Sequence, residues 1–137
     1  MNRYIFILFY LIPLFSFAEE NFLASFISGE YTLVAQGIDT QETYSGSVSI
    51  YLEENKLKIK RVINGKTIFG LANFETALNG DANVLRIRFS EMNINYEETC
   101  LFRSDLDNYA RISCYLYIPG KTILKPGLET FFINHSL

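Results

Sequence analysis

The sequence is poor in the residues that most enzymes and metal sites use. Its 137 residues include no tryptophan, a single histidine, two cysteines and three prolines. The histidine, His135, stands near the last residue, whereas a catalytic triad needs its base on an ordered element. Zinc sites combine three or four His, Cys or carboxylate ligands at set spacings, which the sequence does not offer. We therefore expect no catalytic residue, no metal site, no cofactor and no enzymatic activity.

An excess of positive charge is also missing. Twelve Lys and Arg stand against 15 Asp and Glu, a formal net charge of −3. A mildly acidic chain has no bulk attraction for nucleic acid, so we expect no nucleic-acid partner. We interpret two local rows of basic residues as strand faces exposed to solvent. One row consists of Lys56, Lys58 and Lys60, and the other of Arg86 and Arg88. The alternative is a patch for an acidic partner.

Long apolar runs are limited to one, from Tyr4 to Ala18, which follows Arg3. A membrane-spanning helix needs about 20 apolar residues, so this run is short. Ser16 and Ala18 place small residues where signal peptidase cleaves. We therefore predict a signal peptide over 1–18 rather than a membrane anchor, followed by a single domain over 19–137. The mature protein would be secreted or periplasmic, with no stable membrane insertion.

The rest of the sequence is punctuated by turn signals, of which Asn64-Gly65 and Asn79-Gly80 are the strongest hairpin types. Between the turns, apolar and polar residues alternate with a period of two, which is typical of antiparallel strands with one wet face. A short helical turn is expected over 20–27. The alternation predicts eight strands, over 29–36, 43–52, 56–63, 66–74, 84–90, 95–103, 109–118 and 128–134.

Short strands joined mostly by tight hairpins favour an all-β fold, an eight-stranded antiparallel up-and-down meander. Such a meander can close into a small barrel and so remove its open edges. An eight-stranded barrel has room for side chains or one small ligand. A β-sandwich remains the alternative.

The two cysteines flank a predicted turn centred on Asp107. Pairing residues symmetrically about that centre places Cys100 directly opposite Cys114, within reach of a disulfide bond. An oxidising compartment would allow the bond to form. A redox-active pair is the alternative, although such pairs usually have Cys-x-x-Cys spacing. We therefore predict a structural disulfide.

Two charges fall on apolar strand faces: Arg61 shares a face with Ile59, and Glu98 shares a face with Cys100 and Phe102. A charge inside a barrel is costly unless it is paired. One interpretation is that both reach water at a barrel mouth or pair with each other. The other is that they line a small ligand cavity together with Tyr31 and Tyr96, since converging polar groups mark such pockets.

Four segments, Ser28-Gly29-Glu30-Tyr31, 44–50, 64–70 and 84–89, together resemble small exported bacterial barrels of the calycin-like, lipocalin or avidin type. The resemblance implies a barrel that binds a ligand. It transfers no ligand, because the Gly-x-Trp of lipocalins and the tryptophans of avidins are missing here.

We therefore expect an exported non-enzymatic binding protein that holds a small apolar ligand or contacts a partner protein. The alternative is a secreted or periplasmic enzyme inhibitor or host-interaction factor. It would act through loops at 37–43, 75–83 and 119–127. This second hypothesis rests on analogy between folds.

Overall fold

The computed structural model of the protein describes residues 15–102 and 110–134. The predicted turn around Asp107 and His135 lie outside these residues. One α-helix precedes eight strands, with a short 3₁₀ turn, η1, at Leu78–Gly80. The elements are α1 (Phe15–Ile27), β1 (Gly29–Gln36), β2 (Thr43–Glu53), β3 (Lys56–Ile63), β4 (Lys66–Ala77), β5 (Ala82–Glu91), β6 (Ile94–Leu101), β7 (Ala110–Tyr117) and β8 (Gly127–Ile133).

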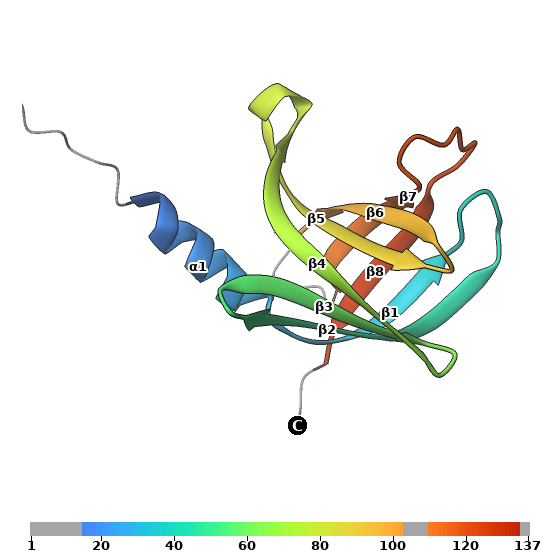
Figure 1. Ribbon diagram of the computed structural model, residues 1–137, viewed down its shortest axis with the longest axis horizontal. Helices are drawn as coiled ribbons and strands as arrows, with labels where there is room; N and C mark the ends of the chain where they lie inside the picture. Colours follow the sequence, from blue (N-terminus) through green and yellow to red (C-terminus); the bar gives the residue numbers. More distant parts are fainter. Residues whose placement is uncertain (1–14, 103–109, 135–137) are drawn as a thin grey trace, which may run out of the picture.

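The eight strands form a closed barrel in sequence order, each antiparallel to its neighbours (Figure 1). β8 closes the barrel on β1, with Leu33 opposite Phe131. The predicted meander is confirmed, and the β-sandwich alternative is wrong because no sheet edge separates β1 from β8. Closure satisfies the backbone hydrogen bonds that the edges of an open sheet would leave unpaired.

Two-residue turns set the register of three hairpins. Asn64 and Gly65 have φ values of 51° and 74°, as the predicted Asn-Gly turn requires. Glu54-Asn55 and Met92-Asn93 also have positive φ throughout, although neither contains glycine. Asn79-Gly80, in contrast, belongs to the longer connection through η1 between β4 and β5.

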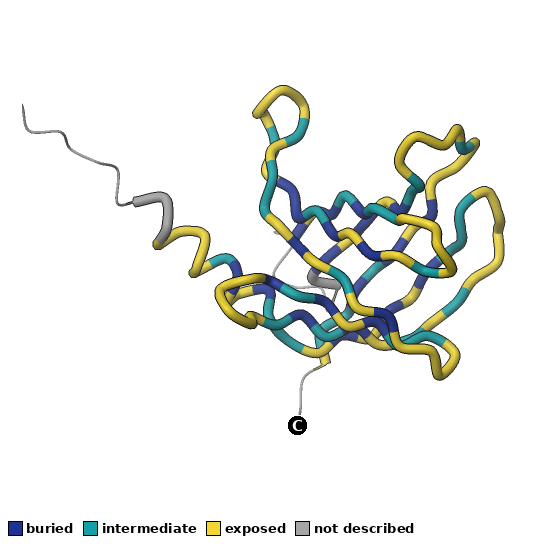
Figure 2. Tube along the Cα trace, in the orientation of Figure 1, coloured by how far each residue is buried: buried dark blue, intermediate teal, exposed yellow. Residues whose placement is uncertain are grey.

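Buried and exposed residues alternate along the strands (Figure 2). The buried members point into the barrel and form one core cluster. The largest fully buried apolar side chains are Tyr31, Leu33, Ile50, Ile59, Leu85, Ile87, Phe102, Ile112 and Phe131, together with Ile27 of the helix. The period-two pattern in the sequence therefore identified the inner face correctly.

Helix α1 packs against one end of the barrel through its last turns. Ala24 and Ile27 are buried, and the hydroxyl of Tyr31 donates a hydrogen bond to the Ile27 carbonyl at 2.6 Å. Ala18, Glu19 and Glu20 are exposed. Removal of residues 1–18 would therefore leave this packing in place. No helix in residues 15–102 and 110–134 combines the length and apolar character that crossing a bilayer requires.

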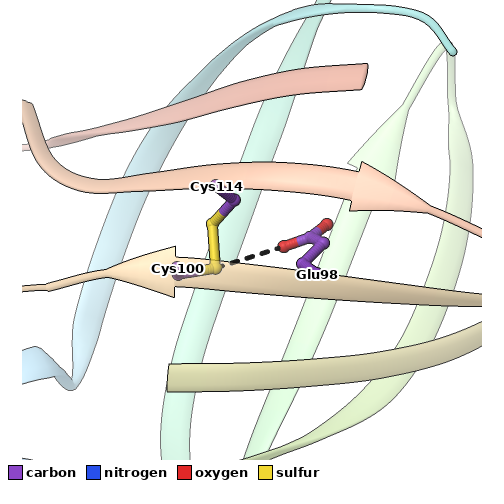
Figure 3. Close-up of side chains that lie close together, drawn as sticks. All are labelled: Glu98, Cys100 and Cys114. Carbon is purple, nitrogen blue, oxygen red and sulfur yellow. Dashed lines mark hydrogen bonds between the residues drawn. A yellow bond between two sulfur atoms is a disulfide. The ribbon is translucent and has the colours of Figure 1, made fainter. Parts of the chain in front are cut away.

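The predicted disulfide is present. Cys100 on β6 and Cys114 on β7 are direct register partners, and their Cα atoms lie 4.0 Å apart (Figure 3). Both side chains are buried in the barrel interior. The bond therefore ties together the two strands that residues 103–109 connect.

Loss of the disulfide should destabilise the barrel without changing its architecture. Cys100→Ala combined with Cys114→Ala should lower the free energy of unfolding by about 3 kcal/mol, because the unfolded chain regains the entropy of the open loop. Urea denaturation of the variant and of the wild-type protein, with and without reductant, measures this. Reductant should destabilise only the wild-type protein, and equal stability of the oxidised wild type and the variant would contradict the expectation.

Candidate functional site

A cavity of about 770 Å³ occupies the end of the barrel opposite α1. Its mouth lies among the β1–β2, β3–β4, β5–β6 and β7–β8 connections, which gather on the right of Figure 1. Its volume is typical of small-molecule sites. The walls are mainly apolar, and the apolar lining consists of Ile38, Ile63, Ile68, Phe89, Ile94, Leu116, Ile118 and Ile123, with Tyr44 and Tyr96.

A buried ion cluster forms the polar part of this site. Arg61 on β3 lines the cavity, although only 2% of its side chain is exposed. Its Nη1 donates to Glu98 Oε1 at 2.5 Å and to Glu129 Oε2 at 2.7 Å, and its Nη2 donates to Glu129 Oε1 at 2.7 Å. Glu98 is on β6 and Glu129 is on β8, so one guanidinium links three strands. The hydroxyl of Tyr44 donates a further hydrogen bond to Glu129.

An aromatic stack supports the guanidinium. Arg61 Cζ lies 4.2 Å from the centroid of the Phe89 ring, which is a cation–π distance. Phe89 in turn stacks on Tyr96, with centroids 5.3 Å apart and an interplanar angle of 15°. Gly70 faces Phe89 on the neighbouring strand, where a Cβ would come within 2.6 Å of the Arg88 carbonyl oxygen. The missing side chain therefore permits the close approach of β4 and β5 beside the ring.

One atom of the cluster has no partner. Arg61 Nε is the buried side-chain polar atom that lacks a hydrogen-bond partner among the described residues. Leaving such a donor unsatisfied costs about 1–3 kcal/mol. The donor belongs to Arg61, a residue that lines the cavity.

The two carboxyl groups of the cluster differ in their protonation. Burial raises the pKa of Glu98 well above its usual range, and the nearby negative charge of Glu129 raises it further; the attraction of Arg61 only partly offsets this. Burial would also raise the pKa of Glu129, but hydrogen bonds and charge from Arg61 outweigh it and lower that pKa. Glu129 is therefore the ionised partner of Arg61, and Glu98 is the group that takes up a proton.

The other two members remain in their ordinary forms. Burial raises the pKa of the Tyr44 hydroxyl, as does the adjacent Glu129 carboxylate, so Tyr44 stays protonated and donates. Burial alone would lower the pKa of Arg61, but Glu98 and Glu129 more than compensate and raise it. The guanidinium is therefore charged at any pH at which the protein folds.

The structure separates the four residues that the sequence suggested for a ligand site. Arg61 and Tyr96 line the cavity. Glu98 lies behind Arg61 and is fully buried, which fits the interpretation that the two charges pair with each other. Tyr31 lies at the opposite end of the barrel, against α1. A ligand-binding role for these residues stays a prediction.

Two members of the cluster, Glu129 and Tyr44, escaped the sequence analysis. Glu129 stands two residues before the buried Phe131, so its side chain falls on the inward face of β8. This is the same signal that drew attention to Arg61 and Glu98. Tyr44 gave no comparable signal, because tyrosine is common on half-buried strand faces.

The basic strand faces carry less free charge than the sequence suggested. Arg88 Nε donates to Glu97 at 2.7 Å, and Arg86 Nε donates to Glu75 at 3.1 Å. Lys58 forms an ion pair with Glu53. These arginines therefore belong to an ion network on the outer face of β4, β5 and β6.

Glu98, Cys100 and Cys114 place potential ligand atoms within 4.8 Å of one another (Figure 3). A metal would need the two sulfur atoms as thiolates. Here the sulfurs are bonded to each other, and Glu98 Oε2 lies 3.8 Å from the Cys100 sulfur. The group as it stands is therefore a carboxyl packed against a disulfide.

A second hollow, of about 490 Å³, lies on the outside of the barrel. Exposed apolar side chains line it, including Leu78, Leu101, Tyr115 and Leu128. Glu129 contributes to its lining, but the side chain of Glu129 is paired with Arg61, which lines the inner cavity. The inner cavity is therefore the stronger candidate for a small-molecule site.

Comparison of the chain with protein-family models, curated proteins and solved structures finds no match. The barrel itself is consistent with a calycin-like fold, and any assignment of function must come from the geometry of the site.

The raised pKa of Glu98 should make stability fall as the solution becomes more alkaline. Unfolded glutamate loses its proton near pH 4.3, whereas folded Glu98 keeps it to higher pH. Between these two values the folded state holds more protons, so the free energy of unfolding decreases as pH rises. The effect of Glu129 on stability has the opposite dependence on pH. Its stabilising contribution is present at neutral pH and is lost only when the solution is acidified through the lowered pKa of Glu129.

Glu98→Gln should remove this decrease in the free energy of unfolding with rising pH, because the amide mimics the protonated acid. Urea denaturation at intervals from about pH 5 to about pH 8 measures it. Glu91→Gln, which alters an exposed ion pair with Lys66, is the matched control and should keep the wild-type slope. An unchanged slope in Glu98→Gln would show that Glu98 is not the titrating group.

Removal of the shared cation should be strongly destabilising. Arg61→Met leaves Glu129 buried without its partner and should cost about 3–5 kcal/mol. Lys66→Met, which removes a cation from an exposed pair at the cavity mouth, should cost less than about 1 kcal/mol. Chemical denaturation of both variants tests the contrast, and similar losses would indicate that the cluster is not buried as described.

Proposed function

We propose that this protein is an exported, non-enzymatic, calycin-like binding protein whose barrel cavity holds a small, largely apolar molecule. The observation that carries the proposal is the cavity of about 770 Å³ that has apolar walls and a buried arginine with an unpartnered Nε. Apolar walls supply affinity, and a few converging polar groups fix orientation.

The energetic cost of the ion cluster supports a role in binding. Burying three ionisable groups carries a desolvation penalty of several kcal/mol per ion, and apolar residues of similar volume often stabilise a core better. The rest of the interior is built from such residues. A cluster whose cation lines the cavity is therefore more readily explained by a polar contact with a ligand than by stability.

The proposed location is the periplasm or the extracellular medium, after removal of residues 1–18. Two observations support it. The helix residues that pack on the barrel, Ala24 and Ile27, follow the predicted cleavage site. The Cys100–Cys114 disulfide suits an oxidising compartment.

The alternative is a partner protein bound on the outside, as for an inhibitor or host-interaction factor. The apolar hollow near Leu101, Tyr115 and Leu128 favours this second candidate. Native mass spectrometry of protein purified from its own host separates the two. A retained small molecule supports the cavity, and a co-purifying macromolecule supports the outer surface.

Cavity binding is tested directly by blocking the cavity. Ile63→Trp places an indole among the lining residues, whereas Val62→Trp, one residue earlier on β3, faces outward and is the matched control. Because the chain has no other tryptophan, its fluorescence also reports the environment of the new indole. Affinity for an environment-sensitive apolar dye should fall at least about tenfold in Ile63→Trp and stay unchanged in Val62→Trp. Equal binding by both variants would contradict the proposal.

A further inference from the structure

The charges around the cavity restrict the class of ligand that it can accept. The lining includes three cationic residues, Arg61, Lys66 and Lys121, and two carboxylates, Asp39 and Glu91. A positive cavity of this kind would attract an anionic amphiphile. Glu129, the ionised carboxylate that pairs with Arg61, cancels that excess, whereas Glu98 beside it holds a proton and adds no charge.

Arg61, the cation that a carboxylate ligand would need, already forms ion pairs within the protein. Glu129 binds both Nη1 and Nη2 of Arg61, and Glu98 also accepts from Nη1. A ligand carboxylate would join the ionised Glu129 around one guanidinium, and like charges at such distances repel strongly in a buried site. At the mouth, Lys66 is paired with Glu91 at 3.0 Å, and Lys121 is exposed to water, so neither lysine replaces the buried guanidinium.

A cationic ligand is also disfavoured. Arg61 is itself positive and lines the floor of the cavity. A ligand with donors only would leave the buried Nε–H of Arg61 unsatisfied. The hydroxyl proton of Tyr44 is donated to Glu129 and is not available to a ligand. The ligand atom that fits the floor of the cavity best is therefore an uncharged hydrogen-bond acceptor.

We propose that the ligand is an uncharged amphiphile with an apolar body along the cavity walls and a carbonyl or hydroxyl oxygen that accepts a hydrogen bond from an N–H of Arg61 that Glu98 and Glu129 leave unused. This inference rests on the proposed function and adds the charge and hydrogen-bonding class of the ligand. Glu129 is the selectivity residue in this account, because it cancels the positive charge that would otherwise recruit carboxylates.

Competition for the cavity-bound dye tests the inference. The competitors are four amphiphiles that share one alkyl chain and end in a primary amide, an alcohol, a carboxylate or a trimethylammonium group. The amide and the alcohol should compete at least about tenfold more tightly than either charged member. Equal or tighter competition by the carboxylate or the ammonium compound would overturn the inference.

Glu129→Gln identifies the residue responsible. Loss of this counter-charge should shift preference towards the carboxylate by about tenfold or more, whereas Glu53→Gln, which makes the same change in net charge at an exposed ion pair with Lys58 outside the cavity lining, should not. An identical shift in both variants would overturn the inference. Should Glu129→Gln fail to fold, the wild-type competition series decides alone.

The outcomes distinguish this inference from the function on which it rests. Preference for the carboxylate, with dye binding still abolished by Ile63→Trp, rejects the uncharged ligand and keeps the binding cavity. Dye binding that is insensitive to Ile63→Trp rejects both.

Discussion

The sharing of one buried arginine by two carboxyl groups is the interaction on which the organisation of this protein depends. Arg61, Glu98 and Glu129 come from β3, β6 and β8, which are not neighbours in the barrel. Only closure of the sheet brings them together inside. Once they meet, separating Arg61 from Glu129 would leave a charge without its partner in an apolar interior, which is far more costly than breaking an exposed ion pair.

The cluster lies between two halves of the barrel interior that differ in their packing. On one side, the interior is filled by apolar side chains and is covered by the end of α1, with Tyr31 bonded to Ile27. On the other side, the interior opens into the cavity between the hairpin tips. The packed half supplies stability and holds the cluster in place, so the open half can be free of the side chains that would otherwise fill it. In the proposed binding function, a floor held by the hydrogen bonds of Arg61 would limit the entropy that is lost when a ligand binds.

Much of the fold follows from the sequence alone, because period-two alternation and turn chemistry are local signals. The eight strands, the Asn64-Gly65 turn and the opposition of Cys100 and Cys114 are all local in this sense. Met92-Asn93 was not identified as a turn, because it lacks the glycine that marks positive φ.

The site was predictable only in part. Arg61 and Glu98 stood out because charges on an apolar strand face need an explanation, but the sequence left open whether they reach water, bind a ligand or pair with each other. Glu129 also has a charge on an apolar strand face. Tyr31 was misleading, because alternation shows that a side chain points inward but not at which end of the barrel it lies. Depth along the barrel depends on the stagger of all eight strands, which no single segment reveals.

The most direct test of the central claim is heteronuclear NMR of the arginine side chains. A guanidinium held by Glu98 and Glu129 in the interior should give separate Nη resonances whose protons exchange slowly with water, and Arg61→Lys should remove only that set. These signals would also show hydrogen-bond couplings to carboxylate carbons. If every guanidinium in the protein exchanged rapidly, Arg61 would be solvated, and the account of the floor, the cavity and its selectivity would be contradicted.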